Sequence, residues 1–169
     1  AAAARLQSAE SVAGVRAETL FAAVAEAAVR SGLRDFNPQG LANTVWAFAT
    51  AGVRAEALFA AVAKVAVGSG LRDFKPQELA NMLWAFASAG VRAEVLFTTA
   101  AEAAVGIGLR HFTPQQLSNV VWAFATAGVR AEALFAAVAG ESAGRLRDFK
   151  PQDLANTGRV RRRCSLRGH

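Results

Sequence analysis

The sequence predicts an all-α protein built as an α-solenoid of 38-residue helix-turn-helix repeats. The first observation is a fixed period, because Trp46, Trp84 and Trp122 lie 38 residues apart and the surrounding prolines and glycines keep the same spacing. A constant period of about 20 to 50 residues is typical of repeat arrays, in which each unit buries its apolar face on its neighbours. The second observation is composition: apolar residues make up 53% of the chain, many of them alanine, and tyrosine is absent. Alanine, leucine and glutamate favour helix over strand.

Each repeat is expected to open with a loop and a first helix. In the unit 33–70, Pro38 suits the first helical position, where its missing N–H would have no partner, and Asn37 is expected to cap the helix. Thr113 is expected to cap in the unit 109–145, whereas the lysines that precede the proline in other copies cap poorly. The first helix should end near Gly52, which stands where a left-handed residue is needed.

A short turn then leads into a second helix, whose first turn carries a glutamate at its positive end in each copy. At 100 degrees per residue, Leu41, Val45 and Phe48 share one apolar arc of the first helix. The matching arc of the second helix contains Leu58, Phe59, Val62, Val65 and Ala66. The two arcs are predicted to face each other, so that each repeat is a helix hairpin.

The period divides the chain into six segments. They are a degenerate N-terminal repeat (1–32), three full repeats (33–70, 71–108 and 109–145), a truncated repeat (146–158) and a basic tail (159–169) that is expected to be disordered. Because Gly14-Val15-Arg16 repeats Gly52-Val53-Arg54, the first segment is interpreted as the second half of a worn repeat whose first helix is degenerate or a cap. A transit peptide is the alternative for residues 1–13. For the tail, an out-of-frame gene model is the alternative to a native segment.

Charge argues only weakly for a nucleic-acid partner. The net charge is +6, yet five arginines lie in the last eleven residues, and the first 158 residues hold 14 basic against 13 acidic side chains. Cys164 is the only cysteine, which excludes an intrachain disulfide scaffold. No uncharged apolar run is long enough to span a membrane. Since the chain opens on Ala1, we expect a fragment or a processed product.

Asparagines are the first candidates for binding RNA bases. Asn43, Asn81 and Asn119 occupy one position of the first helix, with Asn156 in the truncated repeat. An amide can pair with a base edge in a single strand. A base-reading residue should nevertheless differ between repeats, so a hydrogen bond to the backbone of an adjacent turn is the favoured interpretation.

Two further positions of the first helix vary from copy to copy, as base-reading positions would. One holds Gly40, Glu78, Gln116 and Asp153, and the other holds Thr44, Met82, Val120 and Thr157. The competing and slightly favoured interpretation of both is a solvated surface that is free to vary.

Two arginine ladders are candidates for phosphate contacts. Arg34, Arg72, Arg110 and Arg147 recur in the loop before the first helix, and Arg16, Arg54, Arg92 and Arg130 recur in the turn between helices. Most have a nearby acidic residue, so intramolecular pairing competes with phosphate binding and is favoured for the second ladder. Arg110 lacks such a neighbour, since His111 follows it. The tryptophans are able to stack on bases, but burial between repeats is the favoured role.

The sequence contains few residues that could form a catalytic or metal-binding site. His111 and His169 are the only histidines, and no Ser, His and acid set or metal-ligand spacing occurs. We therefore expect no enzyme, no cofactor, no metal site and no small-molecule substrate.

The repeated motif resembles a known family. Pro38-Gln39 followed by Leu41-Ala42-Asn43-Thr44-Val45-Trp46-Ala47-Phe48-Ala49, with copies at 76–87 and 114–125, resembles the octotricopeptide repeat, which is related to the helical repeats that accompany RAP domains. The resemblance covers about residues 14 to 157. It implies an α-solenoid that binds single-stranded RNA in a chloroplast or mitochondrion and affects RNA processing. The alternative function is a protein-protein interaction scaffold, which the nearly neutral repeat body fits better.

Overall fold

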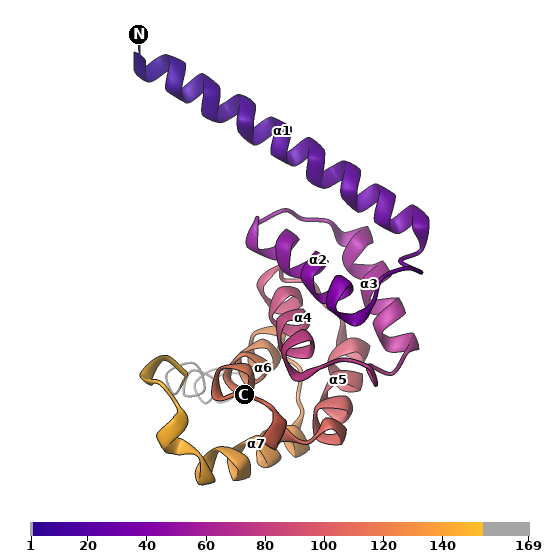
Figure 1. Ribbon diagram of the computed structural model, residues 1–169, viewed down its shortest axis with the longest axis vertical. Coiled ribbons are helices and arrows are strands. Elements are labelled where there is room, and N and C mark those ends of the chain that lie inside the picture. The colour runs from indigo at the N-terminus through magenta and orange to yellow at the C-terminus, as the bar shows by residue number, and fades with distance from the viewer. Residues whose placement is uncertain (1, 154–169) are drawn as a thin grey trace, which may run out of the picture.

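The computed structural model describes residues 2–153, with the backbone alone for residues 2–13, 15, 16 and 146. The α-helices are α1 (Ala2–Ser31), α2 (Pro38–Thr50), α3 (Glu56–Gly68), α4 (Pro76–Ser88), α5 (Glu94–Ile107), α6 (Pro114–Ala127) and α7 (Glu132–Gly144), with 3-10 turns at Leu109–His111 and Leu146–Asp148 (Figure 1). No strand occurs in the described part of the chain. The all-α prediction is therefore confirmed.

The helices form three successive hairpins, α2–α3, α4–α5 and α6–α7, arranged in two layers (Figure 1). The first helices α2, α4 and α6 pack on one another far more closely than the second helices α1, α3, α5 and α7 do. Closer packing on one side makes a stack of hairpins curve, with the closely packed layer on the inside. The architecture is the predicted α-solenoid, with the first helices as its inner layer.

The first helices begin where the sequence places their caps. The Asn37 side-chain oxygen accepts a hydrogen bond from the Gly40 N–H at 2.7 Å, and the Thr113 hydroxyl accepts one from the Gln116 N–H at 3.2 Å. Both bonds satisfy an N–H that has no partner within its helix. Pro occupies the first turn of α2, α4 and α6, as predicted.

Glycines end the same helices in the left-handed conformation. Gly52, Gly90 and Gly128 have φ of 68°, 68° and 72°. The next residue then donates its N–H back to the carbonyl five residues earlier, as Val91 does to Phe86 at 3.0 Å. This is the Schellman arrangement expected for a helix that ends on glycine.

Phenylalanine pairs join each unit to the next. The pairs Phe21–Phe48, Phe59–Phe86 and Phe97–Phe124 have ring centroids 4.9, 5.0 and 5.1 Å apart and meet edge to face. In every pair the first ring belongs to a second helix and the other to the first helix of the following unit. Edge-to-face contact is a favoured geometry for two aromatic rings. The same phenylalanine contact therefore recurs in the core between successive units.

Helix α1 differs from the other units because it does not fold into a hairpin. It runs unbroken through Gly14, and its N-terminal half projects from the body, whereas Phe21, Ala25 and Ala28 pack on the core (Figure 1). The register explains this, since Gln7 and Glu10 stand where α2 has the core residues Val45 and Phe48. Residues 18–31 therefore take the place of a second helix, and the expected tail from residue 159 lies outside the described residues.

Two glycine substitutions should change stability in opposite directions. Gly90 has a φ of 68°, so Gly90→Ala should lower the free energy of unfolding by about 1 kcal/mol. Gly140 lies inside α7, where an added β-carbon would meet no other atom within 4 Å, so Gly140→Ala should raise it by about 0.5 to 1 kcal/mol. Urea unfolding followed by circular dichroism measures both. Shifts of the same sign would contradict the assigned helix ends.

Candidate nucleic-acid interface

A polar groove crosses the inner layer of the solenoid. It has a volume of about 720 Å³ and is open to solvent. Its lining comprises Trp46 of α2, Asn81 and Trp84 of α4, Thr113, Pro114, Gln115 and Asn119 of α6 and its start, and Asp148, Lys150, Gln152 and Asp153 of the segment after α7. Gln, Asn and Trp at successive spacings of four and three residues fall on one face of a helix. The repeat therefore places the same polar stripe on each inner helix.

The asparagine side chains of this stripe have unused hydrogen-bonding groups. Asn43 is exposed, and Asn81 and Asn119 are half-buried at the groove. None of the three amides makes a hydrogen bond to another residue of the described chain. The expected bond to the backbone of an adjacent turn is therefore wrong for these three residues, and Asn156 lies outside the described residues. Each amide can offer one acceptor and two donor hydrogens to a ligand.

The tryptophans divide into one exposed ring and one stacked pair. Trp46 is 44% exposed, whereas Trp84 and Trp122 are half-buried and stack with centroids 6.3 Å apart and planes 28° apart. The expectation that all three lie in the core is wrong for Trp46. Trp84 and Trp122 do link neighbouring repeats, because they stand on α4 and α6. Trp46 presents a partly exposed ring at the groove.

The first variable position of the first helix has a capping role that the sequence interpretation missed. Glu78, Gln116 and Asp153 accept hydrogen bonds from the backbone N–H of Lys75, Thr113 and Lys150 at 2.9, 2.9 and 3.0 Å. Gly40 has no side chain to do this, and its own N–H is capped by Asn37. The pattern of Thr followed three residues later by Gln is a capping-box signature that was readable in the sequence.

The second variable position is closed to RNA in two repeats. Met82 and Val120 are 0% and 1% exposed, because their side chains belong to the hydrophobic core. Their proposed role as base-reading residues is therefore wrong. Thr44 is half-buried and donates its hydroxyl hydrogen to the Gly40 carbonyl at 2.7 Å. Thr157, at the same position of the truncated repeat, lies outside the described residues.

The described arginine side chains of the two ladders do not line the groove. Arg34, Arg72 and Arg110 are exposed, as are Arg54, Arg92 and Arg130. Within the described residues, the ion pairs with a nitrogen-oxygen distance up to 4.0 Å involve only Arg30 and Arg145. The intramolecular pairing that was favoured for the second ladder is therefore wrong for Arg54, Arg92 and Arg130, and the side chain of Arg16 lies outside the described residues. Arg72 instead lines a separate depression on the outer layer, beside Thr99 and Glu102 of α5.

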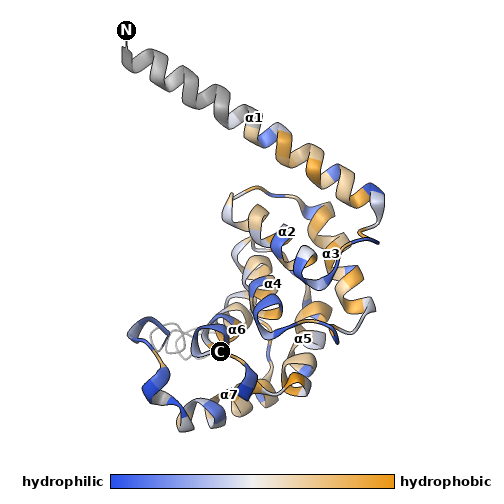
Figure 2. Cartoon of the chain, viewed as in Figure 1, coloured by the Kyte–Doolittle hydropathy of each residue, from blue (hydrophilic) through white to orange (hydrophobic). Residues whose placement is uncertain are grey.

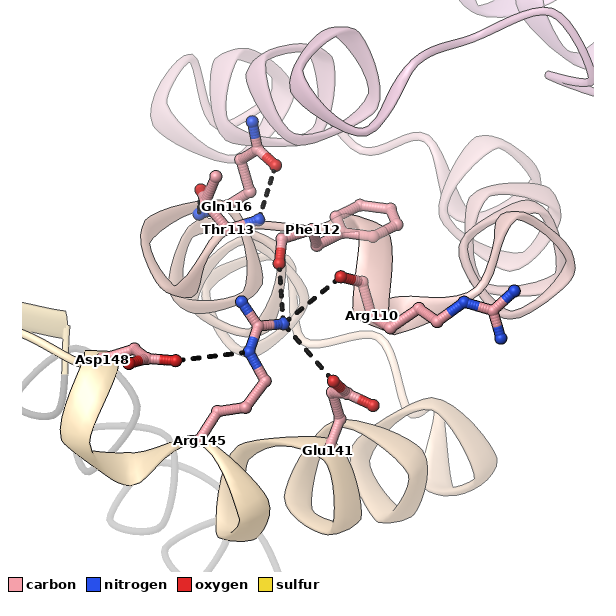
Figure 3. Close-up of polar contacts among 7 residues, drawn as sticks. All are labelled: Arg110, Phe112, Thr113, Gln116, Glu141, Arg145 and Asp148. Carbon is pink, nitrogen blue, oxygen red and sulfur yellow. Dashed lines mark hydrogen bonds and ion pairs between the residues drawn. The ribbon is translucent and has the colours of Figure 1, made fainter.

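Arg145 fixes the segment that forms the far wall of the groove. Its Nη1 donates hydrogen bonds to the Phe112 carbonyl at 3.1 Å and the Arg110 carbonyl at 3.5 Å, and contacts Glu141 at 3.4 Å (Figure 3). Its Nε lies 3.7 Å from a carboxylate oxygen of Asp148. These contacts tie the chain after α7 to the loop before α6. The equivalent position in the other repeats is a glycine, so the repeat pattern does not predict a structural role for Arg145.

A comparison with known families then identifies the kind of protein. Residues 2–168 match the family described as RNA-editing substrate-binding complex 6 protein. The chain belongs to this family. No curated protein matches the sequence. Family membership gives the chain an RNA-related role, with RNA, protein or both as partners.

Metal and membrane features are absent from the part of the chain that the structure describes. Between residues 2 and 153, no three His, Cys, Asp or Glu side chains gather in a group that could hold a metal ion. No helix in that range combines the length and hydropathy needed to cross a bilayer.

Stability measurements should separate Trp46 from the stacked pair. Trp84→Ala removes a half-buried ring and its stacking partner contact, so it should cost about 2 kcal/mol. Trp46→Ala removes an exposed ring and should change the free energy of unfolding by less than about 0.5 kcal/mol. Thermal unfolding of both variants beside the unaltered chain tests this. Equal losses would mean that Trp46 is a core residue.

Proposed function

We propose that the chain binds single-stranded RNA along the inner layer of its solenoid, within an RNA-editing substrate-binding complex. The observation that carries this proposal is the pair of unbonded amides of Asn81 and Asn119 in one groove with the exposed ring of Trp46. Unpaired bases stack on aromatic rings and form hydrogen bonds through their edges. Trp46 supplies a stacking surface and the asparagines supply polar partners for base edges.

Contacts to the bases contribute more to the proposed affinity than contacts to phosphates, because the groove is not strongly charged. Its ionisable lining residues are Lys150, Asp148 and Asp153, and the last accepts the backbone N–H of Lys150. Phosphate contacts fall to exposed arginines beside the groove. Arg110 lies three residues before Thr113, which lines the groove, and its side chain has no ion-pair partner among the described residues.

The repeat family, the lack of a catalytic role and the organelle are proposed from the resemblance of the repeat motif to the octotricopeptide repeat. We place the chain among the octotricopeptide-like repeat proteins, with no catalytic step of its own. Of the two organelles that the resemblance implies, an RNA-editing family favours the mitochondrion. The repeated Pro-Gln and Leu-Ala-Asn segments support this placement, since they build the inner helices that line the groove.

A protein-protein scaffold is the second candidate function. The nearly neutral charge of the described chain supports this function, since the chain has 14 basic and 13 acidic side chains. A surface that binds RNA chiefly through phosphates carries a clear positive excess. A scaffold of this kind would use the same inner groove for a peptide and would give no saturable binding of RNA.

RNA affinity should depend on the groove residues and not on the outer layer. Trp46→Ala and the double change Asn81→Ala with Asn119→Ala should each weaken binding of a fluorescein-labelled random 12-mer RNA by about tenfold, measured by anisotropy. Thr98→Ala, an exposed polar change on α5, is the matched control and should leave affinity unchanged. Equal affinity for all four proteins would place the RNA elsewhere.

The salt dependence of the same titration should report few phosphate contacts. If about four arginines touch phosphates, the slope of log affinity against log salt should be near −3, at about −0.7 per contact on single strands. A chain of residues 1–157 should keep most of the binding, because the groove lies within residues 46–153. Binding that disappears with residues 158–169 would be unspecific attraction to the basic tail and would leave the repeats as a scaffold.

A further inference from the structure

A second depression lies on the outer layer, between α5 and the loop before α4. It has a volume of about 480 Å³ and is open to solvent. Arg72 of the loop and Thr99, Glu102 and Ile107 of α5 are among the residues that line it. Helix α5 is largely hydrophobic (Figure 2), and Glu102 is its only charged residue after the first turn. The depression is therefore a polar site on an otherwise apolar helix.

The two sides of the depression carry hydrogen-bond acceptors that the chain does not use. In the loop, the backbone carbonyls of Arg72 and Phe74 accept no hydrogen bond within the described residues. On α5, Glu102 is exposed and has no ion-pair partner within 4.0 Å in the same part of the chain. Thr99 donates its hydroxyl hydrogen to the Val95 carbonyl at 2.9 Å, so its oxygen can still accept. Acceptors thus outnumber donors beside α5.

In the following unit, an arginine side chain occupies the equivalent place. Ile107 lines the depression beside α5, and the residue 38 positions later is Arg145. Its Nη1 donates hydrogen bonds to the Arg110 and Phe112 carbonyls, which are the counterparts of the two unused carbonyls in the loop before α4 (Figure 3). It also contacts Glu141 of α7 at 3.4 Å. The chain therefore contains its own example of a guanidinium group bound between an outer helix and the loop of the same unit.

The second unit keeps the acceptors of this arrangement but lacks the arginine. Glu102 supplies a carboxylate on α5 as Glu141 does on α7, one residue earlier along the helix. The first unit differs, because Lys64 stands where Glu102 does and would repel a cation. The arginine of the loop does not obstruct such a site, since the Arg110 side chain points away from the Arg145 guanidinium group (Figure 3).

We infer that the depression beside α5 binds the guanidinium group of an arginine side chain, presented by a polypeptide segment outside the described residues. A guanidinium group carries five N–H donors in a planar fork, and Arg145 shows that such a group reaches two carbonyls and a carboxylate at once. An ammonium group lacks this planar geometry and is more strongly hydrated. The site therefore selects arginine over lysine.

This site is independent of the proposed RNA groove. No residue lines both the depression and the groove. Glu102→Gln should therefore leave the affinity for RNA unchanged. Loss of arginine binding would leave the RNA proposal standing, and loss of RNA binding would leave the arginine site.

Nuclear magnetic resonance of the isotope-labelled full chain tests the inference, with N-acetyl-arginine-N′-methylamide as the probe. The probe should shift the amide signals of Phe74, Thr99 and Glu102 saturably at millimolar concentrations. The lysine analogue should bind at least about threefold more weakly. Glu102→Gln should weaken binding of the arginine probe at least about threefold, because it removes the charge and keeps the shape. Glu94→Gln is the matched control, since Glu94 is exposed in the first turn of the same helix, and it should bind like the unaltered chain.

Two further readouts identify the source of the natural arginine. Self-association in sedimentation that Glu102→Gln abolishes assigns it to a second copy. Shifts among residues 158–169 on Glu102→Gln without the probe assign it to the basic segment of the same chain. Probe binding with neither change assigns it to a segment beyond residues 1–169. The inference is overturned if the probe shifts no signal while both readouts stay unchanged, if the arginine and lysine probes bind equally, or if Glu102→Gln binds like the unaltered chain.

Discussion

The structure depends on the burial of one apolar arc of each first helix against the second helix of the preceding unit. Phe48, Phe86 and Phe124 mark this arc, and each meets a phenylalanine of the preceding second helix at about 5 Å. A unit with this arc is not expected to be stable alone, because a neighbouring unit covers part of its apolar surface. A constant period follows from the same requirement, since the same phenylalanine contact recurs once in every unit.

Much of the fold could be predicted from the sequence because local chemistry decides it. Proline and a capping side chain start the inner helices, and Gly52, Gly90 and Gly128 end them in a conformation that other residues adopt at a cost. The straight course of α1 was harder to foresee. Gly14 has the same sequence neighbours as Gly52, but a helix ends at a glycine only when the segment that turns back buries apolar side chains. Gln7 and Glu10 stand at the core positions of that segment, so turning back would bury polar side chains there.

The candidate site was less predictable because coverage by neighbouring helices decides which residues remain accessible. The positions of Met82 and Glu78 both vary between repeats, but Met82 is buried in the core and Glu78 caps a helix. Asn81 is invariant between repeats, which made a structural role attractive, and yet its amide makes no bond within the described chain. Identical asparagines along a groove suit a strand that is contacted in the same way by each repeat. Sequence variation between repeats therefore locates packing differences more readily than ligand contacts.

Arg145 gives the groove two walls of different physical character. The helices on one side are held by apolar contacts and ring stacking, which added salt does not weaken. The segment on the other side is held to the body by a guanidinium group that bridges two carbonyls and two carboxylates. Ions screen the attraction between such charges when they are partly exposed. The attachment of this wall to the body therefore weakens as ionic strength rises, whereas the stacking of the inner helices does not.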